Sequence, residues 1–196
     1  ERLRAAFDDA ERRAGVDEVM LRAPLAEMVA RHLTWQFAHL GLDDPRLRAQ
    51  LADRFVEQVR DAARANIGLL SALKARGFAL GIVSNGCGNV DVLCHDLGYM
   101  PYLSVVVDSR RVGLSKPDPA IYLCAAGRLG LPPSAIMMVG DSFDRDVMPA
   151  RAVGMKTAWL RGPSTRECAD PSAVDVHLLA LAELPAKLEA SERTVA

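Results

Sequence analysis

Residues 136–146 read IMMVGDSFDRD, and the fold class can be inferred from this stretch and the residues around it. Its first four residues are apolar, which is typical of a strand that is buried on both faces of a parallel sheet. Gly140 ends the apolar run, Asp141 follows at once, and Asp146 comes at the start of a helical pattern. Ligands of open α/β sheets bind beyond the carboxyl ends of the strands, and Mg²⁺ prefers oxygen ligands such as carboxylates. The stretch therefore predicts a strand whose end carries acids suited to a metal ion.

The chain ahead of residue 66 has a purely helical pattern. Apolar side chains recur there every three or four positions, so we expect only helices in residues 1–65. Asp44 is the expected N-cap of the third helix and Pro45 its first residue, since proline is tolerated in a first turn. The first helix should end at Gly15 and bury one face, formed by Leu3, Phe7, Ala10 and Ala14.

From residue 66 onward, apolar strands alternate with helical patterns. This alternation predicts an α/β fold with a parallel sheet and right-handed crossovers. Residues 162–171 form the most loop-like stretch. The expected strands are 78–83, 103–107, 136–139, 156–160 and 175–179, and the expected helices include 67–76, 89–97, 119–129, 145–153 and 181–190.

Composition and charge exclude several classes of protein. The chain has 196 residues and a formal net charge of -1, so nothing in its overall charge favours a nucleic acid or an anionic membrane. It contains no apolar run of about 18 residues that would predict a transmembrane helix. Its four cysteines include no Cys-x-x-Cys pair, which is typical of a reduced, cytoplasmic protein. A monomer and a homodimer both remain open.

Two further segments carry polar residues next to predicted elements. Ser84, Asn85 and Gly86 follow the strand at 78–83, where they are either an ordinary turn or an anion cradle at a helix N-terminus. Lys116 lies in the segment SKPDP, where two prolines stiffen the backbone. A lysine is usually a solvated surface charge, but one held in a rigid loop could neutralise charge on a phosphate.

Asp141 and Asp146 also have an alternative interpretation, because an aspartate near a helix start is often only a cap. Pro149 belongs in a first turn, so we expect the helix to start near residue 145. Asp144 should then lie with Asp141 in the loop before that helix.

Taken together and in this order, the Ser-Asn, Lys-Pro-Asp-Pro and Gly-Asp…Asp segments resemble the haloacid dehalogenase-like hydrolase superfamily. The surrounding residues 105–122 and 139–155 resemble the family's central and metal-binding blocks. The resemblance implies a Rossmann-like core at 66–196 that lacks its first strand, with residues 1–65 as a helical cap domain.

The resemblance also implies a chemistry. In the family an aspartate attacks phosphorus, and water then hydrolyses the aspartyl-phosphate. Carried over, Ser84, Asn85 and Gly86 would bind the phosphoryl group, and Lys116 would steady it, so that Ser84 and Lys116 act in catalysis. The implied substrate is a small phosphorylated metabolite, chosen by the cap. The implied cofactor is Mg²⁺, with Asp141 as a protein ligand and Asp146 either as a second ligand or as a residue that orients the ion.

The family's nucleophile is missing from this pattern. It belongs to an Asp-x-Asp pair directly after an apolar first strand, and residues 1–196 contain no pair in that setting. Asp8 and Asp9 are adjacent and lie on a helical pattern, and Asp108 has Arg110 as its second neighbour. Because the first strand is normally central, its loss would expose an unpaired sheet edge. We therefore expect residues ahead of Glu1 to supply the pair, and a naturally inactive relative is the less favoured alternative.

Three functions remain open on this basis. The first is a Mg²⁺-dependent phosphatase that acts on a phosphate monoester. The second is a binding protein built on a catalytically inactive scaffold, and the third is a 2-haloacid dehalogenase, which needs no Gly-Asp block. The sequence assigns no role to Arg110 or Arg111. His32 and His39 lie seven residues apart, where helix packing and substrate contact are both possible.

Overall fold

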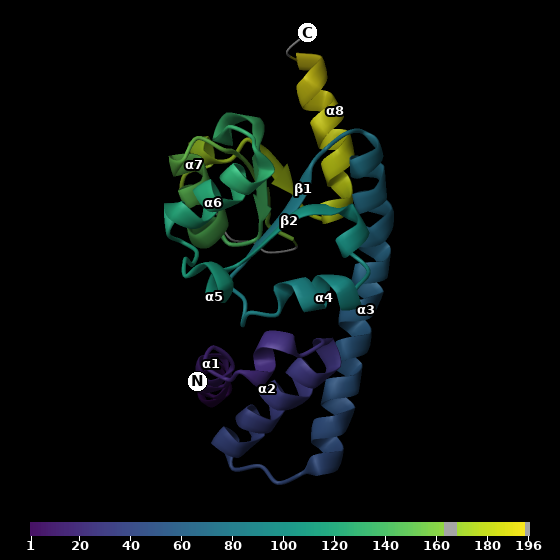
Figure 1. Ribbon diagram of the computed structural model, residues 1–196, viewed down its shortest axis with the longest axis vertical. Helices are drawn as coiled ribbons and strands as arrows, with labels where there is room; N and C mark the ends of the chain where they lie inside the picture. Colours follow the sequence, from purple (N-terminus) through teal and green to yellow (C-terminus); the bar gives the residue numbers. More distant parts are fainter. Residues whose placement is uncertain (163–167, 195–196) are drawn as a thin grey trace.

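The computed structural model describes residues 1–162 and 168–194. It has a helical part and an α/β part, and one long helix, α3, runs along both (Figure 1). Residues 163–167 of the predicted loop at 162–171 lie outside the described residues. All four cysteines are free thiols. No helix within the described ranges is long and apolar enough to cross a membrane.

The helical part contains the helices that the periodicity predicts, but α1 buries a different face. Ala6, Ala10 and Ala14 are fully buried, whereas Leu3 and Phe7 are 73% and 44% exposed. The prediction that Leu3 and Phe7 join the buried face is therefore wrong. The small alanine side chains let α1 pack closely against α2. The elements of this part are α1 (Arg2–Ala14), η1 (Val19–Arg22), α2 (Leu25–Leu40) and α3 (Pro45–Ala75).

Helix α3 is one continuous helix of 31 residues, where the sequence predicts two. It begins as expected, with Asp44 as N-cap and Pro45 in the first turn. The prediction of a separate helix starting at residue 67 is wrong, because the residues between the two apolar patterns are good helix formers and no helix-breaking residue separates them. The predicted boundary between residues 65 and 66 falls inside this helix.

The α/β part confirms all five predicted strands, with ends shifted by up to two residues. Gly98, Gly130 and Gly154 follow its helices with positive φ. The strands are β1 (Leu80–Ser84), β2 (Leu103–Asp108), β3 (Met137–Gly140), β4 (Lys156–Leu160) and β5 (Val176–Leu178). The α-helices are α4 (Val90–Asp96), α5 (Ser109–Val112), α6 (Pro119–Leu129), α7 (Met148–Ala152) and α8 (Leu184–Thr194). Short 3₁₀ turns occur at Met100–Tyr102, Pro133–Ala135, Pro171–Ala173 and Leu181–Glu183.

The strands form two parallel sheets instead of a single one. β1 pairs with β2, with Ser84 opposite Asp108, and β3, β4 and β5 form the second sheet in that order. Within the described ranges β1 and β3 each have only one paired side. The sheet therefore divides between β1 and β3, and both strands present a free edge there.

Two hydrophobic clusters hold the divided sheet together from its two faces. On one face, α6 and α7 pack against Val83 of β1 and Met138 of β3. On the other face, the end of α3 and the start of α8 pack against Leu80 of β1 and Met137 of β3. Neighbouring residues of β3 point to opposite faces, so Met137 and Met138 enter different clusters. Each cluster also contains a residue of β1, and it therefore joins the two sheets. The result is a three-layer arrangement with the sheets in the middle.

The role of Asp44 as the N-cap of α3 can be tested by mutation. The Asp44 carboxylate accepts a hydrogen bond of 2.9 Å from the backbone N–H of Leu47. Replacing Asp44 by alanine should lower the free energy of unfolding by about 1 kcal/mol, measured in urea, because that N–H loses its partner. Asp43→Ala is the matched control. Equal stability losses in both variants would contradict a capping role for Asp44.

Candidate active site

A partly buried ion pair joins the two halves of the divided sheet. Lys116 lies in the loop before α6, and Asp146 lies beyond the end of β3. The Lys116 Nζ atom is 2.7 Å from Asp146 Oδ1, and the two side chains are only 16% and 4% exposed. The structure therefore brings together two of the residues that the sequence selects. At this low exposure each charge depends on the other for compensation.

Asn85 fixes the loop that carries Lys116. Its Nδ2 atom donates to the Lys116 carbonyl at 2.9 Å, and its Oδ1 accepts from the Lys116 backbone N–H at 2.8 Å. The peptide bond between Lys116 and Pro117 is cis. Asn85 follows β1 directly, so the end of this strand and the lysine loop are held in one register.

Asp146 is held against the end of β3 by the backbone. Its Oδ2 atom accepts a hydrogen bond of 3.0 Å from the Ser142 N–H. A Cβ atom at Gly140 would lie 2.3 Å from the Asp146 Cβ, so only glycine fits at that position. Both carboxylate oxygens of Asp146 are therefore engaged, one by Lys116 and one by Ser142.

The segment after β3 differs from its prediction. Residues Phe143–Val147 form a π-helical turn that leads into α7. Asp144 therefore lies within a helical turn and not in the loop that the sequence predicts. The wider turn places the Asp146 N–H and the Val147 N–H over the Ser142 carbonyl, at 2.8 and 3.3 Å.

Ser84 and Asp141 lie at the carboxyl ends of the two free-edged strands. Ser84 is the last residue of β1, and Asp141 directly follows β3. Asp141 is exposed, and its carbonyl accepts a hydrogen bond of 3.2 Å from Trp159 Nε1. In the described chain neither the Ser84 hydroxyl nor the Asp141 carboxylate makes a hydrogen bond, so both are open to a ligand.

These residues fit a partial magnesium site. Within residues 1–162 and 168–194, no three His, Cys, Asp or Glu side chains group closely enough to hold a metal ion. Mg²⁺ is commonly bound by one or two carboxylates, with waters and substrate phosphate completing its shell. The open carboxylate of Asp141 suits this pattern. Asp146, whose oxygens are both engaged, is better placed to orient the shell than to bind the ion directly.

Asp108 is a structural residue of the site that the sequence did not select. It is 3% exposed, and its carboxylate accepts from the N–H groups of Gly88, Val90 and Arg110 at 2.9, 3.1 and 2.9 Å. A Cβ atom at Gly86 would lie 2.6 Å from Asp108 Oδ2. Asp108 thus shapes the loop after β1. An acid ending an apolar strand, with glycines in a facing loop, was the available signal.

Arg110 and Arg111 contact backbone carbonyls and tie the helical part to the core. Arg110 Nη1 donates to the carbonyls of Asp17 and Cys87 at 3.0 and 2.9 Å, and lies 3.4 Å from that of Ala14. Arg111 donates from Nε to the Gly88 carbonyl at 2.6 Å. A positive charge at the C-terminal end of α1 also suits the helix dipole. The two arginines therefore position the helical part beside the loop after β1.

His32 and His39 belong to the packing between α1 and α2. His32 Nε2 lies 2.8 Å from Glu11 Oε1, and its Nδ1 lies 2.7 Å from Gln36 Nε2. His39 lies 3.4 Å from Asp9. Burial alone would raise the pKa of Asp9, but Arg12, Arg13 and His39 together lower it. Both histidines thus have protein partners within the helical part.

Tyr122 braces the turn that carries Asp146. This fully buried residue of α6 donates a hydrogen bond from its hydroxyl to the Arg145 carbonyl. Burial, and then the charge of Asp146, raise the pKa of Tyr122 above its usual value. The hydroxyl therefore stays protonated and keeps donating throughout the neutral range.

Comparison with known proteins gives a family and several relatives. A family model described as haloacid dehalogenase-like hydrolase matches residues 3–154. The chain is 28% identical over 162 residues to haloacid dehalogenase-like hydrolase domain-containing protein 3 of Danio rerio, covering 78% of this chain and 65% of that one. It is 35% identical over 129 residues to N-acetylmuramic acid 6-phosphate phosphatase of Pseudomonas aeruginosa, covering 62% and 57%. The chain thus spans somewhat less than two thirds of these relatives.

A solved structure agrees with the sequence relatives. The crystal structure of an HAD phosphatase from Thermococcus onnurineus superposes with a TM-score of 0.60 at 25% identity. The match covers 95% of this chain and 87% of that one. The predicted fold class, an α/β core with parallel strands and a helical N-terminal part, is confirmed.

The contact between Gly140 and Asp146 predicts a strict need for glycine. Gly140→Ala should lower the free energy of unfolding by about 1–3 kcal/mol, because the new methyl group must displace the Asp146 side chain. Urea unfolding measures the change. Gly127→Ala is the control, since a Cβ at this exposed position in α6 meets nothing within 4 Å. An unchanged stability of Gly140→Ala would show that Asp146 is not held at this distance.

The buried tyrosine predicts an alkaline loss of stability. The pKa of Tyr122 is raised in the folded protein, so its contribution is complete below the unfolded value of about 10 and is lost as pH rises above it. In Tyr122→Phe, the free energy of unfolding should fall less steeply above pH ~10 than in the wild type. Tyr102→Phe is the matched control. Parallel pH profiles for Tyr122→Phe and the wild type would contradict the assignment.

Proposed function

Because the chain belongs to the haloacid dehalogenase-like hydrolase family, we propose that it is the phosphate-binding core and cap of a Mg²⁺-dependent phosphatase. The proposed substrate is a small phosphate monoester. One observation carries this proposal: Asn85, Lys116 and Asp146, from three separate segments, are joined at the strand ends that also carry Ser84 and Asp141. The phosphatases among the relatives support the same reaction class.

The strand ends supply groups of the right charge for a phosphoryl group. The Ser84 hydroxyl and the backbone around Asn85 and Gly86 would donate hydrogen bonds to phosphoryl oxygens. Lys116, anchored through Asn85 and Asp146, would bring a positive charge close to them. A preorganised charge of this kind stabilises the charge that develops in the transition state.

A metal ion would bind on the β3 side of the gap between β1 and β3, opposite Ser84 and Asn85. Asp141 would hold Mg²⁺, and Asp146 would orient its shell from its place against Ser142 and Lys116. When bound, the ion would polarise the phosphoryl oxygens and offset their negative charge. A site that balances phosphate and metal charges would place a lysine and two acids together at the carboxyl ends of the strands.

The proposed reaction also needs a nucleophile. We place it on an Asp-x-Asp segment of the protein beyond the described residues, on a strand between β1 and β3. The free edges of both strands support this position, because a parallel strand there would satisfy their unpaired backbone groups. Its first carboxylate would attack phosphorus, releasing the alcohol, and water would then hydrolyse the aspartyl-phosphate to aspartate and phosphate.

The helical part would act as the selecting cap. Leu21 approaches Gly88 so closely that a Cβ there would lie 2.3 Å from Leu21 Cδ2. Together with the Arg110 contacts, this holds the cap beside the loop after β1. A cap in this position would contact the part of a phosphorylated metabolite that lies beyond its phosphate, and would so select the substrate. We also propose that the protein acts in the cytoplasm.

An activity assay on the full natural protein tests the proposal. With Mg²⁺, it should hydrolyse an aryl phosphate and some members of a panel of phosphate monoesters. Lys116→Met should lower kcat by about a hundredfold or more, because it removes positive charge that offsets the phosphoryl oxygens. Asp141→Asn should lower kcat by a similar factor, because it weakens the hold on Mg²⁺. Lys156→Met, at the opposite end of the sheet, is the matched control.

Three different results would contradict the phosphatase proposal, and each points to a different conclusion. A folded protein with an intact Asp-x-Asp segment that turns over no phosphate ester would overturn the proposal. Phosphate binding without turnover would instead favour an inactive binding scaffold. Halide release from a 2-haloacid without metal would favour a dehalogenase.

A further inference from the structure

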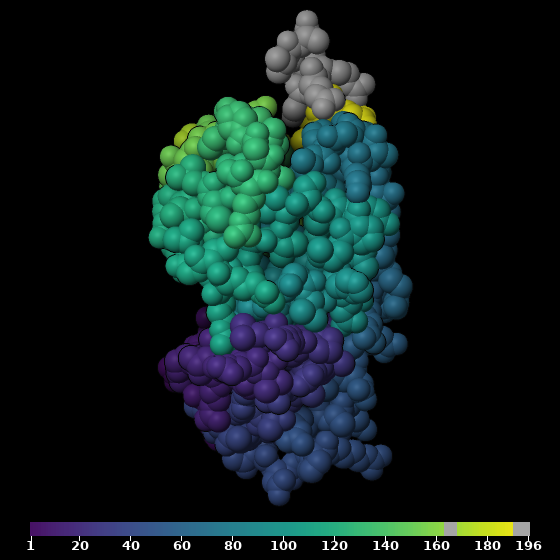
Figure 2. Space-filling model, in the orientation of Figure 1, coloured from purple at the N-terminus to yellow at the C-terminus, as the bar shows by residue number. Residues whose placement is uncertain are grey.

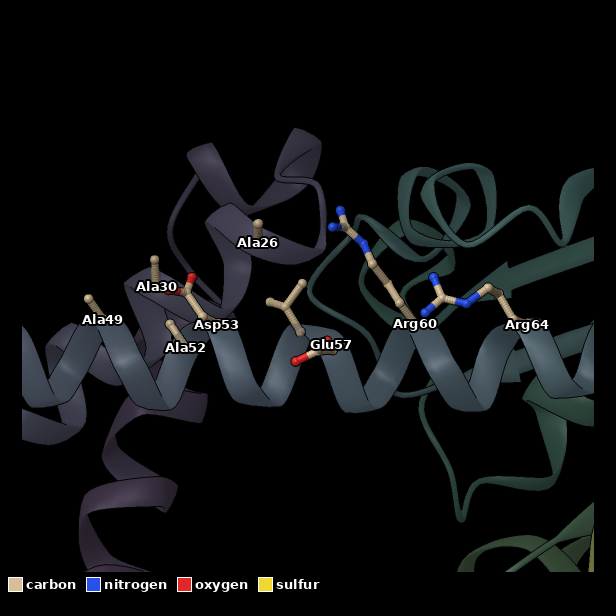
Figure 3. A pocket seen from close by; sticks show the side chains of 9 residues that line it. Ala26, Ala30, Ala49, Ala52, Asp53, Glu57, Arg60 and Arg64 are labelled. Carbon is tan, nitrogen blue, oxygen red and sulfur yellow. The ribbon is translucent and has the colours of Figure 1, made fainter.

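A groove between α2 and α3 lies in the helical part, away from the strand ends (Figure 3). Its volume is about 620 Å³. Small apolar side chains line its floor, namely Ala26 and Ala30 of α2 with Ala49, Ala52 and Val56 of α3. Such small residues would let another helix approach the backbone closely.

Four charged residues of α3 line the same groove in a regular order. Asp53 and Glu57 come first along the helix, and Arg60 and Arg64 follow. Figure 3 shows Asp53, Arg60 and Arg64 projecting from the side of α3 that also faces Ala26. In the part of the chain that the structure describes, neither acid makes an ion pair. Arg60 reaches only Asp96 at 3.6 Å, and Arg64 pairs with exposed Asp61.

The order of these charges is self-complementary. Asp53 and Arg64 are equally distant along the chain from the point between Gln58 and Val59, and so are Glu57 and Arg60. A second α3 running antiparallel about a two-fold axis at that point would set Asp53 opposite Arg64 and Glu57 opposite Arg60. Each pair would occur twice.

The small residues follow the same symmetry. The axis would set Ala49 opposite Gly68 and Ala52 opposite Ala65. A Cβ at Gly68 would meet no atom within 4 Å, so space is open on this side of the helix. With 31 residues, α3 is roughly 45 Å long, which is enough to carry such a contact over several turns.

From this pattern we propose that the protein forms a symmetric homodimer through the α2–α3 groove, with the two α3 helices antiparallel. An isologous interface requires one surface to complement itself, and this charge order does so. A partner of a different kind would need its own matching series of acids and bases, whereas a second copy of this chain already carries it. The proposal is independent of the proposed function, because its residues lie outside the candidate active site.

Charge reversal on α3 tests the interface. Sedimentation velocity of the full natural protein should give twice the mass of one chain, and added salt should weaken the dimer. Asp53→Arg and Arg64→Asp should each weaken dimerisation by about tenfold or more, because each sets two pairs of like charges opposite one another. The double variant Asp53→Arg/Arg64→Asp should restore the dimer with the charges exchanged.

Arg54→Asp is the matched control, because Arg54 is exposed on the same helix about 100° from Asp53 and does not line the groove. It should leave the dimer unchanged, and circular dichroism should show all variants folded. A monomer at all concentrations would overturn the proposal, even if the groove then bound another protein. A dimer that is insensitive to the single reversals, or a double variant that is not restored, would also overturn it.

Discussion

The Lys116 Nζ atom lies 2.7 Å from Asp146 Oδ1, and this partly buried ion pair is the polar link between the two sheets. It joins a loop beside the β1–β2 sheet to the turn after β3, across a division that no backbone hydrogen bond spans among the described residues. Removing Lys116 would leave the Asp146 carboxylate, which is only 4% exposed, without a compensating charge. The pair thus ties the geometry of the candidate site to the stability of the core.

Backbone contacts fix both charged side chains in place. Asn85 binds the Lys116 peptide group from two sides, and Gly140 leaves room for Asp146 where any side chain would collide. On the neighbouring strand, Asp108 orders the loop after β1 through three N–H groups. Rigid surroundings of this kind keep charged groups aimed at one point, which is what electrostatic stabilisation of a phosphoryl group requires.

The helical part is joined to this site by hydrogen bonds to backbone carbonyls and by apolar side-chain packing, in which Val29 and Val56 share a cluster with Leu93 and Leu97. Arg110 binds carbonyls of Asp17 and Cys87, and Asn89 donates to the Ala23 carbonyl at 2.8 Å. The uninterrupted helix α3 connects the same two parts along the right-hand edge of the view in Figures 1 and 2. The helical part is therefore fixed to the α/β part both by these contacts and by the continuous helix.

The sequence by itself determined the strands, the order of the polar segments and the family, because apolar runs and the residues that end them are local features. Residues 136–146 alone were therefore enough to predict a buried strand with acids at its carboxyl end. Three-dimensional packing was needed to show that α3 is continuous, that α1 buries Ala6 in place of Phe7, and that Asp108, Arg110 and Tyr122 support the site. It also decided that Asp146 is engaged by Lys116 and Ser142 while Asp141 stays open. These outcomes depend on which segments meet in space, and a pattern along one segment does not contain that information.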